Sequence, residues 1–334
     1  MRALIVRLGA FGDILHTLPL AADLTAAGWT VDWVCEDRWA PVVAGAATTI
    51  HTLPRRALRD RARPWWDRAR LLGKALAELR QGHDAVIDAQ GLAKSAAVAL
   101  AARGDRLIGH ARGRARECAW LAAGVQVPTV HVHVIDQQRR LALPLTGREP
   151  AGPWRFPLPA WQAERAWAAA WLATQGTERP WILNVGAGWP TKVWPAERQT
   201  EFARTVCASG RRLLLAWGSH GEHAAAAAVA AAVPGTLLAP ETSIPQLAGL
   251  LAAAPVVVSG DTGPLHLARA LDVPAIGLFG PVPAARNGPQ GSRWKNLQAP
   301  GDAWERRDVS RVDMGAITAD QVMAAAESVA DLAG

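Results

Sequence analysis

The chain has 334 residues, of which 50% are apolar and 19% are charged, and its formal net charge is +7. This length exceeds one ordinary hydrophobic core and the composition excludes a disordered chain, so we expect two folded domains. The three cysteines are scattered without metal-ligand spacing, which excludes a disulfide scaffold. The longest uncharged run, 242–260, contains two prolines, so a membrane span is not expected.

Strand-like and helical segments alternate through the first half of the chain. Each strand-like run is short, apolar and bounded by glycine or polar residues, which is typical of a buried parallel strand. This β–α order predicts a doubly wound parallel sheet with helices on both faces. Strands are expected at 3–6, 31–34, 49–53, 85–87 and 106–108, and helices from about 11, at 64–80 and at 93–103.

The first strand is followed by the turn R-L-G-A-F-G-D-I at 7–14. Gly9 and Gly12 would let the backbone turn sharply and approach a ligand, and Asp13 would lie in the first helical turn. A carboxylate there either complements the helix dipole or accepts a proton from a substrate hydroxyl.

The same turn, with Glu36 and Asp37 near the second strand, raises the alternative of a nicotinamide-dependent oxidoreductase. The spacing G-x-x-G-D departs from the dinucleotide fingerprint G-x-G-x-x-G, and Asp13 would repel a pyrophosphate. We therefore rank that alternative low.

Positive charge is concentrated in the first half of the chain. Residues 1–155 carry 22 Lys and Arg against 14 Asp and Glu, whereas 156–334 carry 14 against 15. The densest segment, 55–63, has five arginines and one acid. It predicts an anionic macromolecule or an anionic membrane surface as partner, with a merely solvated face as the alternative. Because no nucleic-acid-binding motif accompanies the charge, we expect no nucleic acid.

Five prolines and two glycines between 144 and 159 predict an interdomain linker. The β–α alternation then resumes. Strands are expected at 181–185, 213–216, 256–258 and 275–278, and helices at 195–208, from about 221, at 262–271 and at about 318–332.

Three strand-to-helix turns of this second half carry groups suited to a nucleotide. Thr191 and Lys192 follow small residues after one strand and predict a phosphate cradle, although a lysine there, taken alone, is more often an ordinary loop residue. Glu222 could accept hydrogen bonds from a ribose diol, or simply be an acid in a first helical turn.

The third of these turns, S-G-D-T-G-P-L-H at 259–266, brings hydroxyls, a carboxylate and an imidazole to a helix N-terminus, where an anion is favoured. Asp261 could be a helix N-cap or a ligand of a polyhydroxyl group. Together with Asp13 in the first half, the three turns favour one shared site over separate structural roles.

At these motifs the chain resembles the lipopolysaccharide heptosyltransferases of glycosyltransferase family 9. The resemblance covers nearly the whole length and favours the type I branch. It is carried by G-D-I-L-H-T-L-P at 12–19, V-I-D-A-Q-G-L-A-K-S at 86–95, K-V-W-P at 192–195, W-G at 217–218 and S-G-D-T-G-P-L-H at 259–266.

The resemblance implies a GT-B fold, two Rossmann-like doubly wound domains that face a central cleft. These would be an acceptor-binding domain at 1–155, a nucleotide-sugar-binding domain at 160–316, and a C-terminal helix at 317–334 that packs back toward the first domain. The implied reaction is inverting transfer of L-glycero-D-manno-heptose from ADP-heptose to Kdo-lipid A.

No cofactor or metal is expected for this reaction. The implied location is cytoplasmic, peripheral on the cytoplasmic face of the inner membrane, and a monomer is the default expectation. The alternatives are another nucleotide sugar or acceptor, as in heptosyltransferase II, and a non-enzymatic anion-binding module.

The resemblance also implies residue roles. Asp13 would be the general base, Lys192 would contact the diphosphate, Glu222 the ribose and Asp261 the heptose hydroxyls. The other expected donor residues are Gly12, Ala187, Gly188, Thr191, Thr242, Thr262, Gly263 and His266. The basic residues expected to meet the acceptor are Arg55, Arg56, Arg59, Arg63, Lys94, Arg114 and Arg116.

Two departures from the family pattern concern the donor. Ala187 and Gly188 stand where relatives carry hydroxyl residues beside the phosphates, so only backbone N–H groups could donate there. Thr242 stands where support of the adenine ring is expected.

Overall fold

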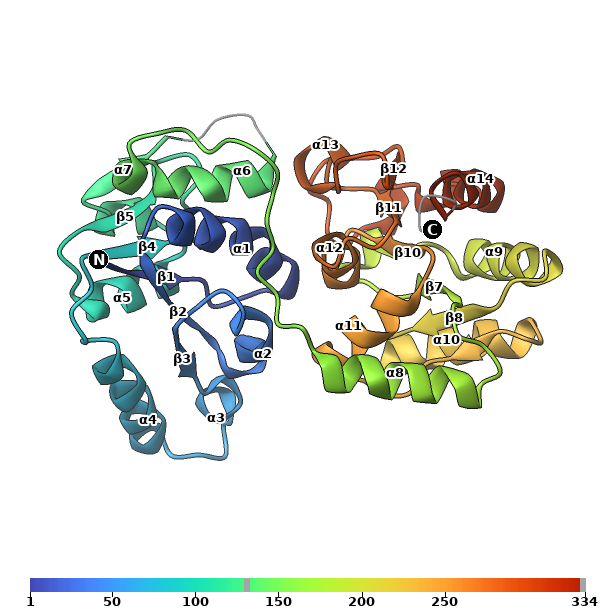
Figure 1. The fold of residues 1–334 in the computed structure, drawn as a ribbon, viewed down its shortest axis with the longest axis horizontal. Helices are drawn as coiled ribbons and strands as arrows, with labels where there is room; N and C mark the ends of the chain where they lie inside the picture. The colour runs from blue at the N-terminus through green and yellow to red at the C-terminus, as the bar shows by residue number, and fades with distance from the viewer. Residues whose placement is uncertain (129–132, 331–334) are drawn as a thin grey trace. The chain divides into compact units, whose positions relative to one another are not determined.

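The computed structural model describes residues 1–128 and 133–330, and the chain divides into two compact units between Pro159 and Ala160 (Figure 1). Each unit is a parallel sheet of six strands covered by helices.

The first unit has strand order β3-β2-β1-β4-β5-β6, all parallel. Its strands are β1 (Arg2–Val6), β2 (Thr30–Glu36), β3 (Thr49–Leu53), β4 (Ala85–Asp88), β5 (Leu107–His110) and β6 (Val125–Val127). Its helices are α1 (Phe11–Ala26), α2 (Ala40–Val43), α3 (Arg55–Arg59), α4 (Trp65–Glu78), α5 (Ala93–Ala102), α6 (Val134–Arg139) and α7 (Leu143–Thr146).

Side chains of the central strands alternate between two packed faces of this sheet. Leu4 and Val86 meet α4 and α5 on one face, where both side chains are fully buried. Helices α1 and α6 pack together on the opposite face (Figure 1). A strand buried on both faces has no polar alternation, which is why these runs read as continuously apolar.

The second unit repeats the design with order β12-β11-β10-β7-β8-β9. Its strands are β7 (Trp181–Asn184), β8 (Leu213–Ala216), β9 (Leu237–Leu238), β10 (Val257–Gly260), β11 (Ala275–Phe279) and β12 (Trp294–Gln298). Its helices are α8 (Gln162–Thr174), α9 (Ala196–Ala208), α10 (His220–Ala232), α11 (Ile244–Ala253), α12 (Gly263–Ala270), α13 (Ala284–Asn287) and α14 (Ala319–Ala330).

Counted within each unit, both sheets have the Rossmann order 3-2-1-4-5-6. The strand order reverses between β1 and β4 in the first unit and between β7 and β10 in the second. Open α/β sheets bind ligands beyond the carboxyl ends of the strands at such a switch point. The predicted class of fold, two doubly wound α/β domains, is confirmed.

The linker predicted at 144–159 begins inside α7 and then runs without regular structure against the first unit. Its Trp154 donates a hydrogen bond to Asp136 Oδ1 at 2.8 Å. A methyl group on Gly45 would stand 2.5 Å from the carbonyl oxygen of Pro157, so the linker backbone lies directly on that glycine.

The C-terminal helix, α14, belongs to the core of the second unit, and its predicted packing back toward the first domain stays a prediction. The contacts described for α14 are with α9 and with β10 to β12, and its Val322, Ala326 and Val329 belong to the core of the second unit. These three apolar side chains share one helical face, which the second sheet already buries. The rest of the predicted helix, 331–334, lies outside the described residues. No helix of the described part is both long and apolar enough to cross a membrane.

Candidate functional site

The predicted donor residues of the second unit follow β7, β8 and β10, which are adjacent in the sheet. Because the strands are parallel, their carboxyl ends share one edge. Lys192 lies in the 3₁₀ turn Pro190–Lys192 after β7, Glu222 in the first turn of α10 after β8, and Asp261 directly after β10. The sheet therefore brings together three residues that are far apart in the sequence.

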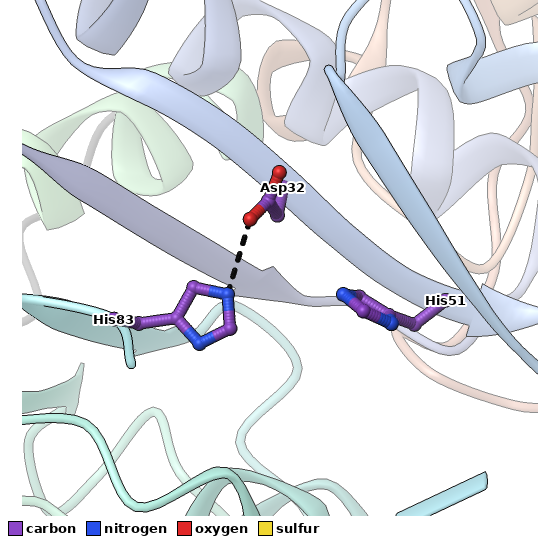
Figure 2. A group of neighbouring side chains, drawn as sticks. All are labelled: Asp32, His51 and His83. Atoms are coloured by element: carbon purple, nitrogen blue, oxygen red, sulfur yellow. Dashed lines mark hydrogen bonds and ion pairs between the residues drawn. The ribbon is translucent and has the colours of Figure 1, made fainter. Parts of the chain in front are cut away.

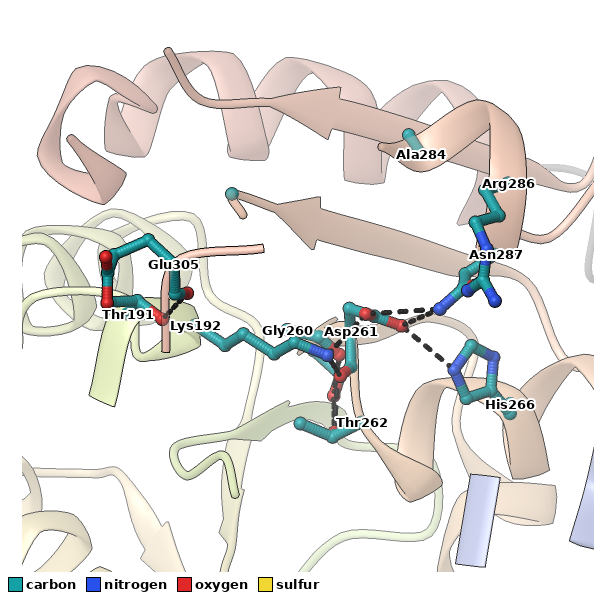
Figure 3. A network of polar contacts seen from close by, with 12 residues as sticks. Thr191, Lys192, Gly260, Asp261, Thr262, His266, Ala284, Arg286, Asn287 and Glu305 are labelled. Atoms are coloured by element: carbon teal, nitrogen blue, oxygen red, sulfur yellow. Dashed lines mark hydrogen bonds and ion pairs between the residues drawn. The ribbon is translucent and has the colours of Figure 1, made fainter. Parts of the chain in front are cut away.

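Lys192 and Asp261 form a buried ion pair at the switch point (Figure 3). Lys192 Nζ lies 2.6 Å from Asp261 Oδ2 and donates a second hydrogen bond to the Asp261 carbonyl oxygen at 3.2 Å. The side chains are 13% and 3% exposed, respectively. An ammonium has three donors, so one N–H of Lys192 remains for a further acceptor.

The Asp261 carboxylate has two further partners. Its Oδ1 lies 3.1 Å from His266 Nε2, and Asn287 Nδ2 lies 3.5 and 3.4 Å from Oδ1 and Oδ2 (Figure 3). Burial by itself would raise the pKa of Asp261. The hydrogen bond and charge of His266 and the charge of Lys192 outweigh burial and hold this pKa well below its usual range. Asp261 is therefore an anion that binds donors.

Asp261 is not a helix cap, so that alternative is wrong. The N-cap of α12 is Thr262, whose side chain makes no capping hydrogen bond. Its hydroxyl instead lies 3.0 Å from Ser259 Oγ and accepts from Asn184 Nδ2 at 3.3 Å. The N–H of Gly263, the first residue of α12, has no acceptor within the helix, as at any helix N-terminus. This end of α12 therefore favours an anion.

The loop after β7 packs closely against Glu222. A methyl group on Gly186 would stand 2.1 Å from Glu222 Oε1, so only glycine leaves room for that side chain. Glu222 Oε2 also accepts the N–H of Gly218 at 2.8 Å. The carboxylate is thus fixed across the ends of β7 and β8.

Thr191 does not offer its hydroxyl to a ligand as the predicted phosphate cradle requires. The side chain is buried, and Oγ1 donates to the Glu305 carbonyl oxygen at 2.8 Å (Figure 3). Sequence spacing placed Thr191 in the right turn but could not tell which way its side chain points. Its role is to fix the turn that carries Lys192.

The remaining predicted donor positions lie around this cluster. Gly188 is exposed and Ala187 is half-buried in the loop after β7. Thr242 is half-buried in the segment between β9 and α11, directly before Ser243, the N-cap of α11. Among the described residues, none of the three has a side-chain partner that would compete with a ligand, and their predicted roles stay predictions.

Asp13 lies where the sequence predicted, in the first turn of α1. Its Oδ2 is 2.7 Å from the Arg7 guanidinium, and Arg7 also donates to the Ala89 carbonyl oxygen at 2.6 Å. The Arg7 side chain is 4% exposed, whereas that of Asp13 is 47% exposed. A buried cation at the end of β1 therefore holds an accessible carboxylate. Gly12 is already helical, so the predicted turn is made without it.

The residues expected to meet an acceptor all follow β3, β4 or β5, at the same edge of the first sheet as Asp13. Arg55 pairs with Glu36 at 2.9 Å and Arg63 with Asp67 at 3.0 Å. Arg114 donates to Gln137 Oε1 at 3.1 Å. The others, all exposed, are Arg56, Arg59, Lys94 and Arg116.

One cluster of the described residues has metal-ligand chemistry, and it lies away from both switch points. Asp32, His51 and His83 are buried together with ligand atoms within 4.8 Å of one another (Figure 2). Asp32 Oδ2 is 3.1 Å from His83 Nε2 but also 2.6 Å from Arg2, and Oδ1 accepts the N–H of Thr49. Since a guanidinium already neutralises this carboxylate, a metal would have to displace it.

Sequence reasoning missed Arg7, Arg286 and Asn287. Asn287 reaches Asp261 from the end of α13, and Arg286 donates to Asn287 Oδ1 at 2.6 Å. No sequence motif marks Arg286 or Asn287. Arg7 carried a signal, because a charged residue directly after a buried strand needs a partner.

Comparison with known proteins identifies the family to which this chain belongs. Residues 70–314 match the model of glycosyltransferase family 9 (heptosyltransferase). Lipopolysaccharide heptosyltransferase 1 of Escherichia coli K12 is 32% identical over 318 residues, 90% of this chain and 94% of that protein. The Pseudomonas aeruginosa protein of the same name is 32% identical over 296 residues, 84% of this chain and 79% of that protein.

The solved structures agree with the sequence comparison. The E. coli heptosyltransferase WaaC with ADP superposes with a TM-score of 0.81 at 29% identity, covering 98% of this chain and 100% of that one. The same enzyme with ADP-2-deoxy-2-fluoro heptose gives a TM-score of 0.77, covering 98% and 99%. The chain belongs to glycosyltransferase family 9 and has the GT-B fold. The alternative of a nicotinamide-dependent oxidoreductase is therefore wrong.

Proposed function

We propose that this family 9 glycosyltransferase transfers L-glycero-D-manno-heptose from ADP-heptose to the Kdo-lipid A inner core of lipopolysaccharide. The observation that carries the proposal is the Lys192–Asp261 pair beside the N-terminus of α12. This pair offers a cation, an anion and free N–H groups at one switch point, which suits a sugar diphosphate. The similarity to a heptosyltransferase solved with ADP and with a fluorinated ADP-heptose supports the same donor.

The second unit would hold the donor. The unused N–H of Lys192 and the N–H of Gly263 would donate to the diphosphate, and Glu222 would accept from the ribose hydroxyls. Asp261 holds Lys192 and, as the family resemblance implies, would also accept from heptose hydroxyls. Its long contacts to Asn287 are the ones that a sugar hydroxyl could most easily replace.

The first unit would activate the acceptor. Asp13 Oδ takes the proton of an acceptor hydroxyl while that oxygen forms a bond to the anomeric carbon from the side opposite the diphosphate. The bond between the anomeric carbon and the phosphate oxygen breaks, and ADP leaves with its electron pair. Inversion follows from this single displacement. Arg7 keeps the Asp13 carboxylate oriented.

We propose that no metal ion is needed to stabilise the departing ADP. Lys192 and the N-terminus of α12 supply positive charge at the place where negative charge develops. Added chelator should leave the rate unchanged, and a loss of activity that Mg²⁺ restores would contradict this part of the proposal.

The direct test is mass-spectrometric detection of heptose on the deacylated acceptor core, with and without ADP-heptose. Asp13→Ala should abolish transfer and retain ADP binding, measured as ADP-induced thermal stabilisation. Lys192→Ala should weaken that stabilisation. Near-normal turnover by Asp13→Ala would refute the base assignment.

The nucleotide base is tested separately, because Thr242 departs from the family pattern at the adenine position. ADP should stabilise the protein more strongly than UDP or GDP at equal concentration. A stronger effect of UDP or GDP would favour another nucleotide sugar. A protein that bound polyanions through its first half yet ignored all three nucleotides would be an anion-binding module.

The acceptor and the location of the protein complete the proposal. An anionic, lipid-linked acceptor suits the basic edge of the first sheet, which carries Asp13. We propose peripheral contact with the cytoplasmic face of the inner membrane, where such an acceptor would be reached.

A further inference from the structure

Two neighbouring tryptophans at the start of α4 stand in solvent. Trp65 is 69% exposed and Trp66 is 62% exposed, and their rings meet edge to face with centroids 6.0 Å apart. Tryptophan is highly buried on average, so an exposed adjacent pair calls for an explanation. Trp304 is also exposed, but the Arg286 guanidinium lies 5.0 Å from its ring centroid. No described cation lies over the rings of Trp65 or Trp66.

The exposure follows from the way α4 overhangs the first unit. Ala75 and the flanking Leu72 and Leu76 are the α4 residues that pack on the core of the sheet, followed by Leu79. Trp65 precedes Leu72 by seven residues, about 10 Å along a helix. The first two turns of α4 therefore extend past the core. Figure 1 shows this end of α4 beside α3 at the lower end of the first unit.

The segment that contains the tryptophans is strongly basic. Residues 55–70 contain seven arginines and two aspartates. Arg56, Arg59 and Arg61 are exposed and form no ion pair with any described residue, whereas Arg63 is paired with Asp67 at 3.0 Å. Three uncompensated cations thus lie within ten residues of two uncovered indole rings.

The position of this segment matters as much as its composition. Helix α3 begins two residues after the end of β3, so the segment leaves the sheet at the carboxyl edge. Asp13 follows β1 at that same edge, because β1, β2 and β3 are parallel neighbours. A surface that binds this segment is therefore held near the edge that carries the reactive carboxylate.

We propose that Arg56, Arg59, Arg61, Trp65 and Trp66, here called the Trp–Arg face, dock this protein on the surface of an anionic lipid bilayer. The proposal rests on the proposed function in one respect, that the acceptor is lipid-linked. It goes further by assigning the contact with the membrane to particular side chains, separate from recognition of the acceptor sugar.

Each component of the face matches one layer of a bilayer surface. Indole rings are amphipathic and concentrate at the headgroup level of membranes. Guanidinium groups donate in pairs to lipid phosphates, and basic residues near an anionic leaflet are attracted within a Debye length. Stable peripheral binding needs two such signals together, an apolar one and a polybasic one.

Binding of the full chain to vesicles tests the proposal. The vesicles contain phosphatidylethanolamine with phosphatidylglycerol and no acceptor lipid, and bound protein is measured by sedimentation. Trp65→Ala/Trp66→Ala should lower the partition coefficient at least about tenfold. Arg56→Gln/Arg59→Gln/Arg61→Gln should lower it about 100-fold, at roughly fivefold for each arginine, and the wild-type value should fall as salt rises.

Matched variants control for loss of any tryptophan or any positive charge. Trp304→Ala removes another exposed indole, and Arg103→Gln/Arg204→Gln/Arg307→Gln removes three exposed arginines elsewhere. Both should bind vesicles like the wild type. Equal losses in test and control variants would overturn the proposal. Binding only to vesicles that contain the acceptor lipid would also overturn it, in favour of headgroup recognition.

A transfer assay separates this proposal from the proposed function. With a deacylated, water-soluble acceptor, Trp65→Ala/Trp66→Ala should keep the wild-type kcat/KM. With the acceptor embedded in vesicles, the same variant should lose about tenfold. Equal rates of wild type and variant on embedded acceptor would overturn docking through these tryptophans. No transfer by the wild type to either acceptor, with normal vesicle binding, would refute the proposed function alone.

Discussion

Replacement of Asp261 by asparagine tests whether the buried ion pair organises the donor side of the site. The carboxylate is 3% exposed and lies 2.6 Å from Lys192 Nζ. Removing one partner of a buried pair typically destabilises a protein by about 3–5 kcal/mol, because the other charge stays buried without compensation. Lys192 keeps 13% exposure and its bond to the Asp261 carbonyl oxygen, so we expect the lower part of that range, about 3 kcal/mol.

A double-mutant cycle measures the pair itself. Lys192→Met leaves a carboxylate that still meets His266, and the double variant Asp261→Asn/Lys192→Met leaves neither charge. The loss in the double variant should fall short of the summed single losses by about 2 kcal/mol. Denaturant unfolding followed by circular dichroism gives the four free energies. Additivity within about 0.5 kcal/mol would refute the argument that these two groups stabilise each other.

The lowered pKa of Asp261 predicts that the difference in unfolding free energy between the wild type and Asp261→Asn depends on pH. His266 and Lys192 lower the pKa of Asp261 against the opposing effect of burial, so the carboxylate holds a proton less readily in the folded protein than in the unfolded chain. Its contribution is then fully present above about pH 4, the unfolded value, and is lost as the pH falls. The advantage of the wild type over Asp261→Asn in unfolding free energy should shrink below about pH 4. A constant difference down to pH 2 would contradict the assignment.

Three further substitutions test single packing or positioning contacts. Gly186→Ala should displace the Glu222 carboxylate, weakening ADP binding by about tenfold in calorimetric titration with little change in unfolding free energy. Arg7→Met should leave Asp13 unsupported, so kcat should fall by roughly 10- to 100-fold while the KM for ADP-heptose stays constant; a raised KM alone would argue for a donor contact. Gly45→Ala should push on the linker backbone 2.5 Å away and lower the unfolding free energy by about 1–3 kcal/mol without altering ADP affinity, and an unchanged melting temperature would contradict that contact.

The central strands could be predicted because they are buried on both faces and their sequences show it. The strands that the sequence did not predict are β6, β9 and β12, and each lies at an edge of its sheet. An edge strand has one paired neighbour and less burial, so β9 has only two residues, both half-buried. Its apolar run is too short to separate from a loop. β3, the remaining edge strand, was predicted because T-I-H-T-L is rich in β-branched residues.

The candidate site was predictable where the topology alone decides which residues meet. Strand-to-helix turns of a parallel sheet share one edge, so Lys192, Glu222 and Asp261 had to be neighbours once the strands were correct. Side-chain direction is decided by tertiary contacts instead. Thr191 turns to the Glu305 carbonyl, and Asn287 reaches Asp261 from a separate helix, and neither follows from spacing.

The exposure of the Trp–Arg face could not be predicted from the sequence, because it too depends on tertiary packing. The arginine run was visible in the composition, but the sequence around the tryptophans did not indicate that they are exposed. Trp65 is seven residues before Leu72, so the two lie on one helical face, and a helical pattern predicts that both are buried. The structure packs the leucine on the core and exposes the tryptophan, because the core contacts of α4 begin at Leu72, about two turns after the helix N-terminus. Where the core ends is a property of the whole unit, and an apolar residue beyond it contacts either solvent or a partner.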